Sequence, residues 1–431
     1  MTRSILFPIF FAVVFSLLAL VQLYEYRTYR RWVLRVFSPD RYAVLLNTAR
    51  VVLGIGNIFI ILQVIVRGSN SYAELLLQYT IVYPAGVYLA AAVLGFLILL
   101  ATDCSRLVAF WIRRIMRLAK QLSISGSTSV EFPQTAELSE RRRQFLKIAG
   151  ASALGVTFGS PFISSIASTR DYRITRIPIS FPNLPVGLHG LSIAQLSDVH
   201  AGIYMTEEHM MEIVELTNSL HANIVVLTGD HVDSSDIQIP SVSKAMGLLA
   251  SDYGIYGCLG NHDHFATSER VSAALQGMGV VMLDNANRTL TINGEKFSMI
   301  GVDDAGYGRS NFANLDEALK GADPQLFRIL LSHRPEFFPH AKKAGIDLTL
   351  SGHTHGGQVG IEFGGVNLNP AYLVTKYVRG LFNEDGRQMY VNVGVGMVGV
   401  PIRIVRPEIT LITLQRAEVL LRTSPSPTTG S

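Results

Sequence analysis

The stretch Leu191-Ser192-Ile193-Ala194-Gln195-Leu196-Ser197-Asp198-Val199-His200 joins a short apolar run to an Asp-x-His triplet. Apolar runs of this length predict buried strands. Four later runs also precede polar motifs: Ile224–Thr228 before Gly229-Asp230, Ile255–Leu259 before Gly260-Asn261-His262-Asp263, Phe327–Leu331 before His333, and Leu348–Leu350 before Gly352-His353-Thr354-His355. This order predicts an α/β fold whose polar side chains meet at the carboxyl ends of the strands.

Amphipathic stretches between these runs predict the helices of the same fold. Thr206 followed by Glu207 and Glu208 is typical of a helix N-terminus, because acidic side chains interact favourably with the helix dipole. Pro335 can similarly occupy the first turn of a later helix. Residues 173–417 are therefore long enough to form one complete α/β domain.

The polar motifs supply carboxylate, imidazole and amide groups and contain no thiolate. Such groups suit divalent manganese, iron, zinc or nickel, and the residues do not discriminate among these metals. Two ions about 3.5–4 Å apart can hold a phosphate and activate water. A single Asp-x-His or a lone His333 would say little, because Asp and Gly end strands in many folds. The joint order of the motifs indicates a metal-dependent site.

The order D-x-H, G-D, G-N-H-D, H and G-H-x-H resembles the calcineurin-like metallophosphoesterase superfamily. Gly356-Gly357-Gln358, which follows the last motif, resembles its bacterial membrane-anchored, twin-arginine-type branch. The resemblance covers residues 173–417, including 392–396 and 401–403. It implies two mixed β-sheets flanked by helices, an αββα sandwich. It also implies a phosphoric ester hydrolase in which a hydroxide shared by two metal ions attacks phosphorus.

The resemblance assigns a metal-binding role to seven side chains. One ion would be held by Asp198, His200 and His355, the other by Asn261, His333 and His353, and both by Asp230. A carboxylate can bridge two cations whereas an imidazole cannot, which supports the bridging role. The neutral amide oxygen of Asn261 would limit the total negative charge and leave the site cationic toward phosphate.

The remaining polar residues near these motifs receive other roles. By the same resemblance, His262 would be the general acid that protonates the leaving oxygen, and Asp263 would orient it. The alternative is that His262 only contacts the substrate phosphate. His264 has no role in the pattern and is expected to be exposed. Further candidates to hold phosphate oxygens, each with a structural alternative, are Arg334, Lys376 and Arg379.

Apolar residues are concentrated before residue 170. The chain has a mean hydropathy of +0.30, and 48% of its residues are hydrophobic. Residues 1–122 are predicted to form a membrane domain, because they contain three runs long enough to cross about 30 Å of hydrocarbon. The runs are Ile5–Tyr24, Tyr42–Val66 and Tyr79–Ala101. Asn47, Arg50 and Asn57 lie within the second run and would also suit a transport path, although anchoring explains three spans better.

The segments that follow divide the rest of the chain. Residues 123–144 are predicted to be a polar linker that leads into a twin-arginine-like motif, Arg142-Arg143-Gln144-Phe145-Leu146-Lys147. Arg141 and the internal position depart from the usual pattern, so ordinary charge flanking a span is the alternative. Residues 145–168 form a fourth apolar segment, either transmembrane or signal-like. Residues 418–431 are predicted to be a disordered tail.

Charge indicates how the chain lies in the membrane. Residues 1–170 contain 18 Lys and Arg against 7 Asp and Glu, whereas residues 171–431 contain 19 against 26. The positive charge therefore flanks the spans, and neither nucleic acid nor a protein partner is expected. The basic loops after the first and third spans should be cytoplasmic. A fourth crossing would place the catalytic domain outside the inner membrane; without it the domain would be cytoplasmic.

The predicted activity is that of a membrane-anchored phosphoesterase acting on a lipid or an envelope-linked phosphoester. One alternative is hydrolysis of UDP-2,3-diacylglucosamine in lipid A synthesis. That substrate is cytoplasmic, and some relatives that cleave nucleotide-lipid pyrophosphates have Arg where this chain has His262. The alternative from another class is an inactive domain used for membrane binding or signalling. The presence of all seven predicted ligand residues argues against this alternative, because an inactive domain would usually lack a ligand. Cys104 and Cys258 provide no disulfide framework.

The charge distribution generates a topology prediction. A reporter fused after Arg170 should behave as extracytoplasmic, and one inserted in the 123–144 linker as cytoplasmic. Paired phosphatase and fluorescent-protein fusions would measure both positions. A cytoplasmic signal at both positions would contradict the fourth crossing. It would then favour the alternative in which the substrate is cytosolic.

Overall fold

A computed structural model describes residues 3–66, 80–81, 83–122, 171–306, 311–363, 366–399 and 403–417. The chain divides into two compact units, one containing the predicted membrane helices and the other the predicted catalytic domain. The linker, the twin-arginine-like motif, the fourth apolar segment and the predicted tail lie outside the described residues.

The first unit consists of long helices over the three predicted spans. They are α1 (Arg3–Val36), α2 (Pro39–Val66) and α4 (Tyr83–Leu122). Each continues beyond the predicted run at one end or both, and the basic residues after the first run are helical. Among the described residues, two helical stretches are long and apolar enough to cross a membrane, Pro39–Leu62 and Pro84–Leu118.

Polar side chains join these helices to one another. Gln22 and Asn57 exchange two side-chain hydrogen bonds of 3.0 Å, and Gln22 also donates to the Tyr88 hydroxyl at 3.1 Å. Arg50 donates to the Tyr26 hydroxyl at 2.9 Å. Interhelical hydrogen bonds of this kind help helices associate in an apolar medium. The polar residues of α2 therefore have a packing role.

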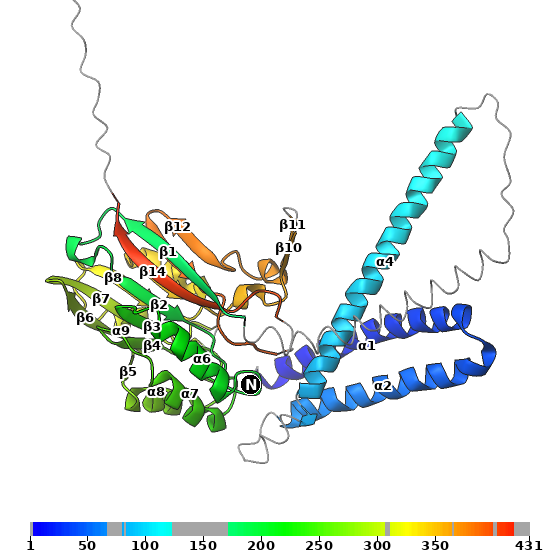
Figure 1. Ribbon diagram of the computed structural model, residues 1–431, viewed down its shortest axis with the longest axis horizontal. Helices are drawn as coiled ribbons and strands as arrows, with labels where there is room; N and C mark the ends of the chain where they lie inside the picture. The colour runs from blue at the N-terminus through cyan, green and yellow to red at the C-terminus, as the bar shows by residue number, and fades with distance from the viewer. Residues whose placement is uncertain are drawn as a thin grey trace, which may run out of the picture. The chain divides into compact units, whose positions relative to one another are not determined.

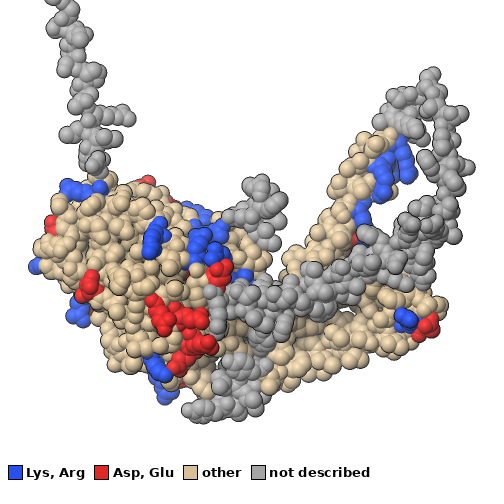
Figure 2. All heavy atoms as spheres, viewed as in Figure 1, with Lys and Arg blue, Asp and Glu red and all other residues tan. Residues whose placement is uncertain are grey.

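Charge is unevenly placed on both units. Figure 2 shows basic side chains of the first unit along the far part of α4, and basic and acidic side chains together near the α1–α2 turn, with mostly uncharged surface elsewhere on the helices. On the second unit, acidic side chains gather over α6, whose sequence contains Glu207, Glu208, Glu212 and Glu215. Figure 2 shows basic side chains on the second unit as well, but residues 171–431 contain 19 Lys and Arg against 26 Asp and Glu, so the excess of positive charge lies in residues 1–170.

Two six-stranded mixed sheets form the centre of the second unit. The first, in spatial order, is β1 (Arg173–Phe181), β14 (Glu408–Arg416), β2 (Ser192–Leu196), β3 (Ile224–Thr228), β4 (Ile255–Cys258) and β5 (Val280–Met282). The second is β12 (Gly380–Glu384), β13 (Arg387–Val391), β9 (Leu348–Ser351), β8 (Phe327–Leu331), β7 (Glu295–Gly301) and β6 (Ala286–Ile292). A short hairpin is formed by β10 (Ile361–Phe363) and β11 (Val366–Leu368).

Alternation along the strands builds four layers. In β2 and β3, Ile193, Ile224 and Val226 face the second sheet, whereas Ala194 and Leu227 face helices. The helices on the first sheet are α6 (Glu207–Asn218), α7 (Ile239–Met246) and α8 (Ser268–Gly277), and those on the second are α9 (Leu315–Ala318) and α10 (Phe338–Lys343). This arrangement, visible in Figure 1, confirms the predicted αββα sandwich.

The helix signals in the sequence also correspond to structure. Thr206 is the N-cap of α6, and its hydroxyl accepts a hydrogen bond from the backbone of His209. Pro335 begins a short 3₁₀ turn, Pro335–Phe337, which leads directly into α10. Both signals follow a strand, β2 and β8 respectively, so they mark where the loops between these strands and the next helices end.

Candidate metal centre

The polar motifs meet where their strands end. The backbone N–H of Asp198 donates to Gly229 at 3.1 Å, and that of His200 donates to Asp230 at 3.0 Å, so the segments after β2 and β3 run together. In the second sheet, Gly352 donates to His333 at 3.0 Å. Because β2, β3 and β4 are mutually parallel, as are β8 and β9, their carboxyl ends carry these residues to one region.

Five of the predicted ligands have a left-handed backbone. They are Asp198, His200, Asp230, His353 and His355, with φ between 49° and 72°. This conformation costs a non-glycine residue about 1–3 kcal/mol and persists only where the surrounding structure enforces it. Such residues concentrate at functional sites. These five residues lie close together in the fold. Their strained backbones therefore indicate that the region positions their side chains at a cost in stability.

One group of potential ligands consists of Asp198, His200 and His355, all buried. The Nε2 atoms of His200 and His355 are 3.1 Å apart. The Oδ1 atom of Asp198 lies 3.5 Å from His355 Nε2 and 3.9 Å from His200 Nε2. Three donor atoms that converge within such distances could hold a metal ion.

Two further groups are His200, Asp233 and His262, which shares His200 with the first, and Asp230, His333 and His353. His333 Nε2 lies 3.0 Å from Asp230 Oδ2 and 3.1 Å from His353 Nδ1. The other ring nitrogen of His333 is 2.8 Å from the Thr228 carbonyl, to which it donates. This contact fixes the tautomer and directs Nε2 toward the cluster.

Asp230 connects its own group with the group of Asp198, His200 and His355. Its Oδ2 atom is 3.0 Å from His333 Nε2 and 3.6 Å from His200 Nε2. Its Oδ1 atom accepts a hydrogen bond from the backbone of His262 at 2.8 Å. The carboxylate therefore lies in the position expected of a ligand shared between two ions.

Asn261 follows β4, and its amide oxygen is buried without a hydrogen-bond partner. Leaving a buried acceptor unsatisfied is costly, and native structures rarely do so without a ligand, ion or water. A cation would satisfy this oxygen. The donor atoms in this region thus fit divalent metal: two carboxylates, four imidazoles and one amide oxygen.

Burial controls the protonation of these groups. It raises the pKa of Asp198 to about 6 and lowers the pKa values of His200, His353 and His355. Burial opposes a charged His333 too, but the Asp230 and Asp198 carboxylates raise its pKa to about 10. Three of the four imidazoles are therefore held neutral, as metal ligation requires, and a metal ion would displace the proton on the fourth.

His262 lies at the edge of the cluster with its side chain about one-fifth exposed. Its ring meets that of His200 edge-on, with 4.5 Å between centroids. Its Nδ1 atom contacts the backbone carbonyl of Asp233. The predicted contact between His262 and Asp263 is not the one the structure shows, because the Asp263 carboxylate is turned toward backbone N–H groups instead.

Asp263 is completely buried and ties two ligand-bearing segments together. Its oxygens accept hydrogen bonds from the backbone of Gly260 at 2.9 Å and of Asp230 at 3.0 Å. They also accept from the backbones of His231 and Val232, and Oδ2 lies 3.0 Å from the His231 ring. Asp263 therefore positions the loop of Asp230 rather than the His262 ring.

His264 differs from the prediction that it is exposed. Its side chain is 15% exposed, bonded to Asp303 at 2.7 Å and stacked on Phe312 with centroids 4.0 Å apart. Burial alone would lower its pKa, but the Asp303 carboxylate raises it above the ordinary value. A polar residue can lose its exposure when an aromatic ring and an acid from a distant segment cover it, which local sequence does not reveal.

The three basic candidates for phosphate contact separate into different environments. Arg334 donates to Asp304 at 2.7 Å, and its Nη1 atom is 3.1 Å from His353 Nε2, so it borders the cluster. Lys376 instead pairs with Glu384 at 2.9 Å on the surface. Arg379 is half-buried and directly precedes β12. Arg334 therefore lies directly beside a metal-ligand candidate, whereas Lys376 is held in a surface ion pair.

Arg403 is an organising residue that the metal motifs do not predict. It is buried, and its guanidinium donates to the backbone carbonyls of Val393, Gly394 and Gly396. Its Nη1 atom is 3.4 Å from His355 Nδ1. Burial lowers the pKa of Arg403 to about 10, which still leaves it cationic near pH 7.

Close packing explains the glycine before His353. A side chain at Gly352 would collide with Ser197 and with the Asp198 carboxylate. The backbone N–H of His353 approaches that carboxylate and donates to both of its oxygens at 3.0 Å. The Gly-His-x-His pattern therefore serves two purposes, ligand supply and direct support of Asp198.

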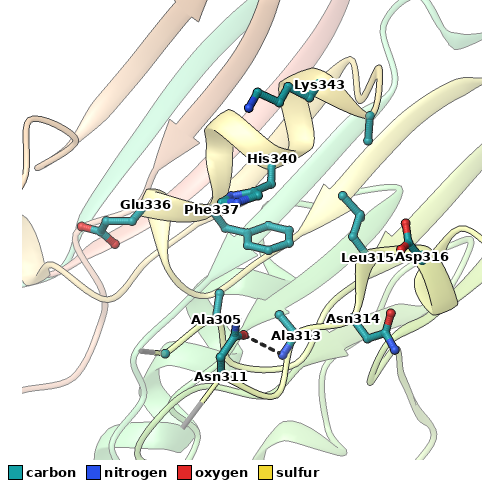
Figure 3. A pocket seen from close by; sticks show the side chains of 12 residues that line it. Ala305, Asn311, Ala313, Asn314, Leu315, Asp316, Glu336, Phe337, His340 and Lys343 are labelled. Atoms are coloured by element: carbon teal, nitrogen blue, oxygen red, sulfur yellow. Dashed lines mark hydrogen bonds between the residues drawn. The ribbon is translucent and has the colours of Figure 1, made fainter. Parts of the chain in front are cut away.

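A cavity of about 730 Å³ lies elsewhere in the same domain. Figure 3 shows Phe337 and His340 on one side of it and Asn311, Ala313 and Leu315 on the other. None of the predicted metal ligands lines it. The cavity is therefore distinct from the cluster of Asp and His residues.

Comparison with known proteins agrees with this geometry. Residues 191–357 match the family model of the calcineurin-like phosphoesterases. The chain is 32% identical over 282 residues to the metallophosphoesterase YkuE of Bacillus subtilis, covering 64% of this chain and 97% of the relative. It is 31% identical over 317 residues to a transmembrane protein with a metallophosphoesterase domain from Danio rerio, covering 70% and 68% respectively.

Solved structures with partial similarity include a dimetal phosphatase from Danio rerio, with a TM-score of 0.32 and 14% identity. It aligns with 48% of this chain and 88% of its own. An archaeal phosphodiesterase aligns with 47% of this chain and 84% of its own, with a TM-score of 0.27 and 16% identity.

The fold and the converging Asp and His side chains define a metal-dependent phosphoester hydrolase. The chain belongs to the calcineurin-like metallophosphoesterase family. Its relatives include proteins named as transmembrane, and this chain itself has apolar helices long enough to cross a membrane.

The contacts of Asp263 generate a prediction. Asp263→Ala should leave several buried N–H groups without acceptors, which costs about 1–3 kcal/mol for each. We expect a destabilisation of roughly 3 kcal/mol or more, together with loss of bound metal. Thermal unfolding in detergent and elemental analysis would measure both effects.

Asp385→Asn provides the control, because Asp385 is exposed, pairs with Lys342 at the surface, and has a left-handed backbone (φ 55°) that Asn tolerates. Its effect should stay within about 0.5 kcal/mol. Equal stability and equal metal content in both variants would contradict the positioning role of Asp263.

Proposed function

We propose that this protein is a membrane-anchored phosphoesterase that uses two divalent ions. The observation that carries this proposal is the position of Asp230, whose Oδ2 atom lies between the imidazoles of His333 and His200. Asp198, His200 and His355 would hold one ion, and Asn261, His333 and His353 the other. Bound ions would polarise the phosphate and lower the pKa of a water molecule.

Protein groups around these ligands have separate tasks. Asp198 is oriented by the backbone of His353, and His355 is flanked by the cationic Arg403. Arg334, held by Asp304, borders His353 and can contact a non-bridging phosphate oxygen. The site therefore combines fixed ligands with two guanidinium groups, Arg403 beside His355 and Arg334 beside His353.

His262 is the candidate general acid. Because its Nδ1 atom faces the Asp233 carbonyl, Nδ1 carries a hydrogen and Nε2 is the atom free to exchange a proton. Its partial exposure leaves room for a leaving group beside it. A protonated His262 could therefore deliver a proton to the leaving oxygen, while the Asp233 carbonyl stabilises the ring in the required orientation.

A lipid or envelope-linked phosphoester is the proposed substrate class. The apolar helices would hold the catalytic domain near a bilayer, where such substrates are concentrated. If residues 145–168 form a fourth crossing, the charge bias of the loops would make the domain extracytoplasmic in a multi-pass inner-membrane protein. A screen of the purified full chain against phosphomonoesters, phosphodiesters and pyrophosphates, each with manganese, iron, zinc or nickel, would test substrate and metal together.

Replacing the shared carboxylate tests the proposal most directly. Asp230→Asn should empty or distort the metal pair and abolish hydrolysis, because a neutral amide cannot replace the bridging charge. Metal content, unfolding temperature and hydrolysis would be measured together. The surface substitution Asp385→Asn serves as the matched control. Near-normal activity of Asp230→Asn with metal still bound would exclude the two-ion reading.

His262→Ala separates proton delivery from phosphate binding. The hydrolysis of esters with alkoxide-like leaving groups should slow by about 10²–10⁴-fold. The hydrolysis of nitrophenyl esters should slow much less, because nitrophenolate departs without a proton. Metal content should be unchanged, because the backbone bond from residue 262 to Asp230 survives the substitution.

The control is His340→Ala, an exposed histidine that lines the separate cavity. Both substrate types should react at the normal rate with this variant. Equal losses on both substrate types with His262→Ala would mean that His262 holds phosphate or water and does not protonate the leaving group.

A further inference from the structure

An apolar tip projects from the catalytic unit at residues 372–374. Leu373 is 90% exposed and Val374 is 84% exposed, and the neighbouring Tyr372 is 48% exposed. No other large apolar side chain in the described part of the chain is as exposed as Leu373 or Val374. Val186, for comparison, is 65% exposed. Adjacent apolar side chains held this far into solvent usually mark a binding surface.

Hydrogen bonds hold the tip in a defined shape. It belongs to the 3₁₀ turn Pro370–Leu373, whose N-cap is Asn369. The Asn369 side chain accepts from the backbone of Ala371 at 3.0 Å. The backbone N–H groups of Val374 and Thr375 both donate to the Ala371 carbonyl at 3.0 Å. The folded turn itself therefore directs the apolar side chains outward.

The same turn is connected to the metal centre. The Asn369 side chain donates to the carbonyl of Gly356 at 2.8 Å, and Gly356 directly follows the ligand His355. A side chain at Gly357 or Gly360 would collide with Asn369, so this segment packs closely against the base of the tip. Whatever binds the tip is thereby held at a fixed position relative to His355.

The composition of the tip indicates a lipid bilayer as its partner. The exposed Tyr372, Leu373 and Val374 are followed by Lys376, which pairs with Glu384 at 2.9 Å, and by Arg379, and residues 369–379 include no acidic residue. Aromatic and basic residues around an aliphatic anchor are typical of membrane interfaces. A stable protein interface needs about 800 Å² from each partner, which three side chains cannot provide.

We propose that Tyr372, Leu373 and Val374 insert into the interfacial region of the membrane that anchors the chain. Insertion would present the metal centre to the lipid surface through the link from Asn369 to Gly356. The inference depends on the proposed anchoring by the apolar helices, although it does not depend on hydrolysis.

Fluorescence quenching in proteoliposomes tests this inference on the full chain. In a Cys104→Ser background, single cysteines at Leu373→Cys, Val374→Cys, Val186→Cys and Leu97→Cys would each carry an environment-sensitive label. Cys258 is buried and would not compete. Leu97, exposed on α4 within the candidate span, reports on anchoring, and Val186 reports on a solvent-facing site.

We expect labels at 373 and 374 to be quenched several-fold more by nitroxide lipids, and several-fold less by aqueous iodide, than the label at 186. Iodide quenching at 373 equal to that at 186, with the label at 97 shielded, would overturn tip insertion while leaving anchoring intact. Quenching of the label at 97 by iodide would overturn the anchoring itself. Protection at 373 from both quenchers would indicate a protein contact and also overturn insertion.

Discussion

The requirement to neutralise two buried carboxylates governs the catalytic domain. Asp198 and Asp230 lie together at the edge of the sheets, where an uncompensated charge would be very unfavourable. Backbone N–H groups of His353 and His262 bond to their oxygens, and His333 adopts a high pKa beside them. These contacts compensate part of the charge. Divalent cations would complete the compensation, so affinity for metal follows from the way the site is buried.

Two buried charged residues organise the loops around that centre in complementary ways. Asp263 collects backbone N–H groups from the segments after β3 and β4. Arg403 collects backbone carbonyls from the segment after β13. Such charge-assisted bonds are stronger than neutral ones, and they can hold ligand residues in a left-handed backbone that they would otherwise avoid.

Much of this domain was predictable from local pattern. The apolar runs before Asp198, Asp230 and His333 correspond to β2, β3 and β8, because a buried strand needs only a short apolar segment with a turn after it. The positions of individual side chains depend on contacts between distant segments. Asp263 bonds to residues about thirty positions earlier in the chain, and Phe312 covers His264 from a separate loop. No local rule encodes such partners.

The sequence motifs also did not predict the roles of residues that are not metal ligands, because these roles again depend on contacts between distant segments. Arg403 lies beyond the last motif, and only the return of the chain toward β14 brings it beside His355. The exposed tip at Leu373 was also missed, since apolar residues near a Pro and a Lys suggest an ordinary loop. In both cases the informative quantity is burial or exposure, which the sequence specifies only through the complete fold.

The place of β14 has a consequence for biosynthesis. This strand, the last described one, lies between β1 and β2, so residue 173 pairs with residue 408 in the inner part of the first sheet. A ribosome releases β1 and β2 more than two hundred residues before the strand that must separate them. The first sheet therefore cannot be completed until β14 has been translated, and pairing of β1 directly with β2 before then would trap the domain in a misfolded state.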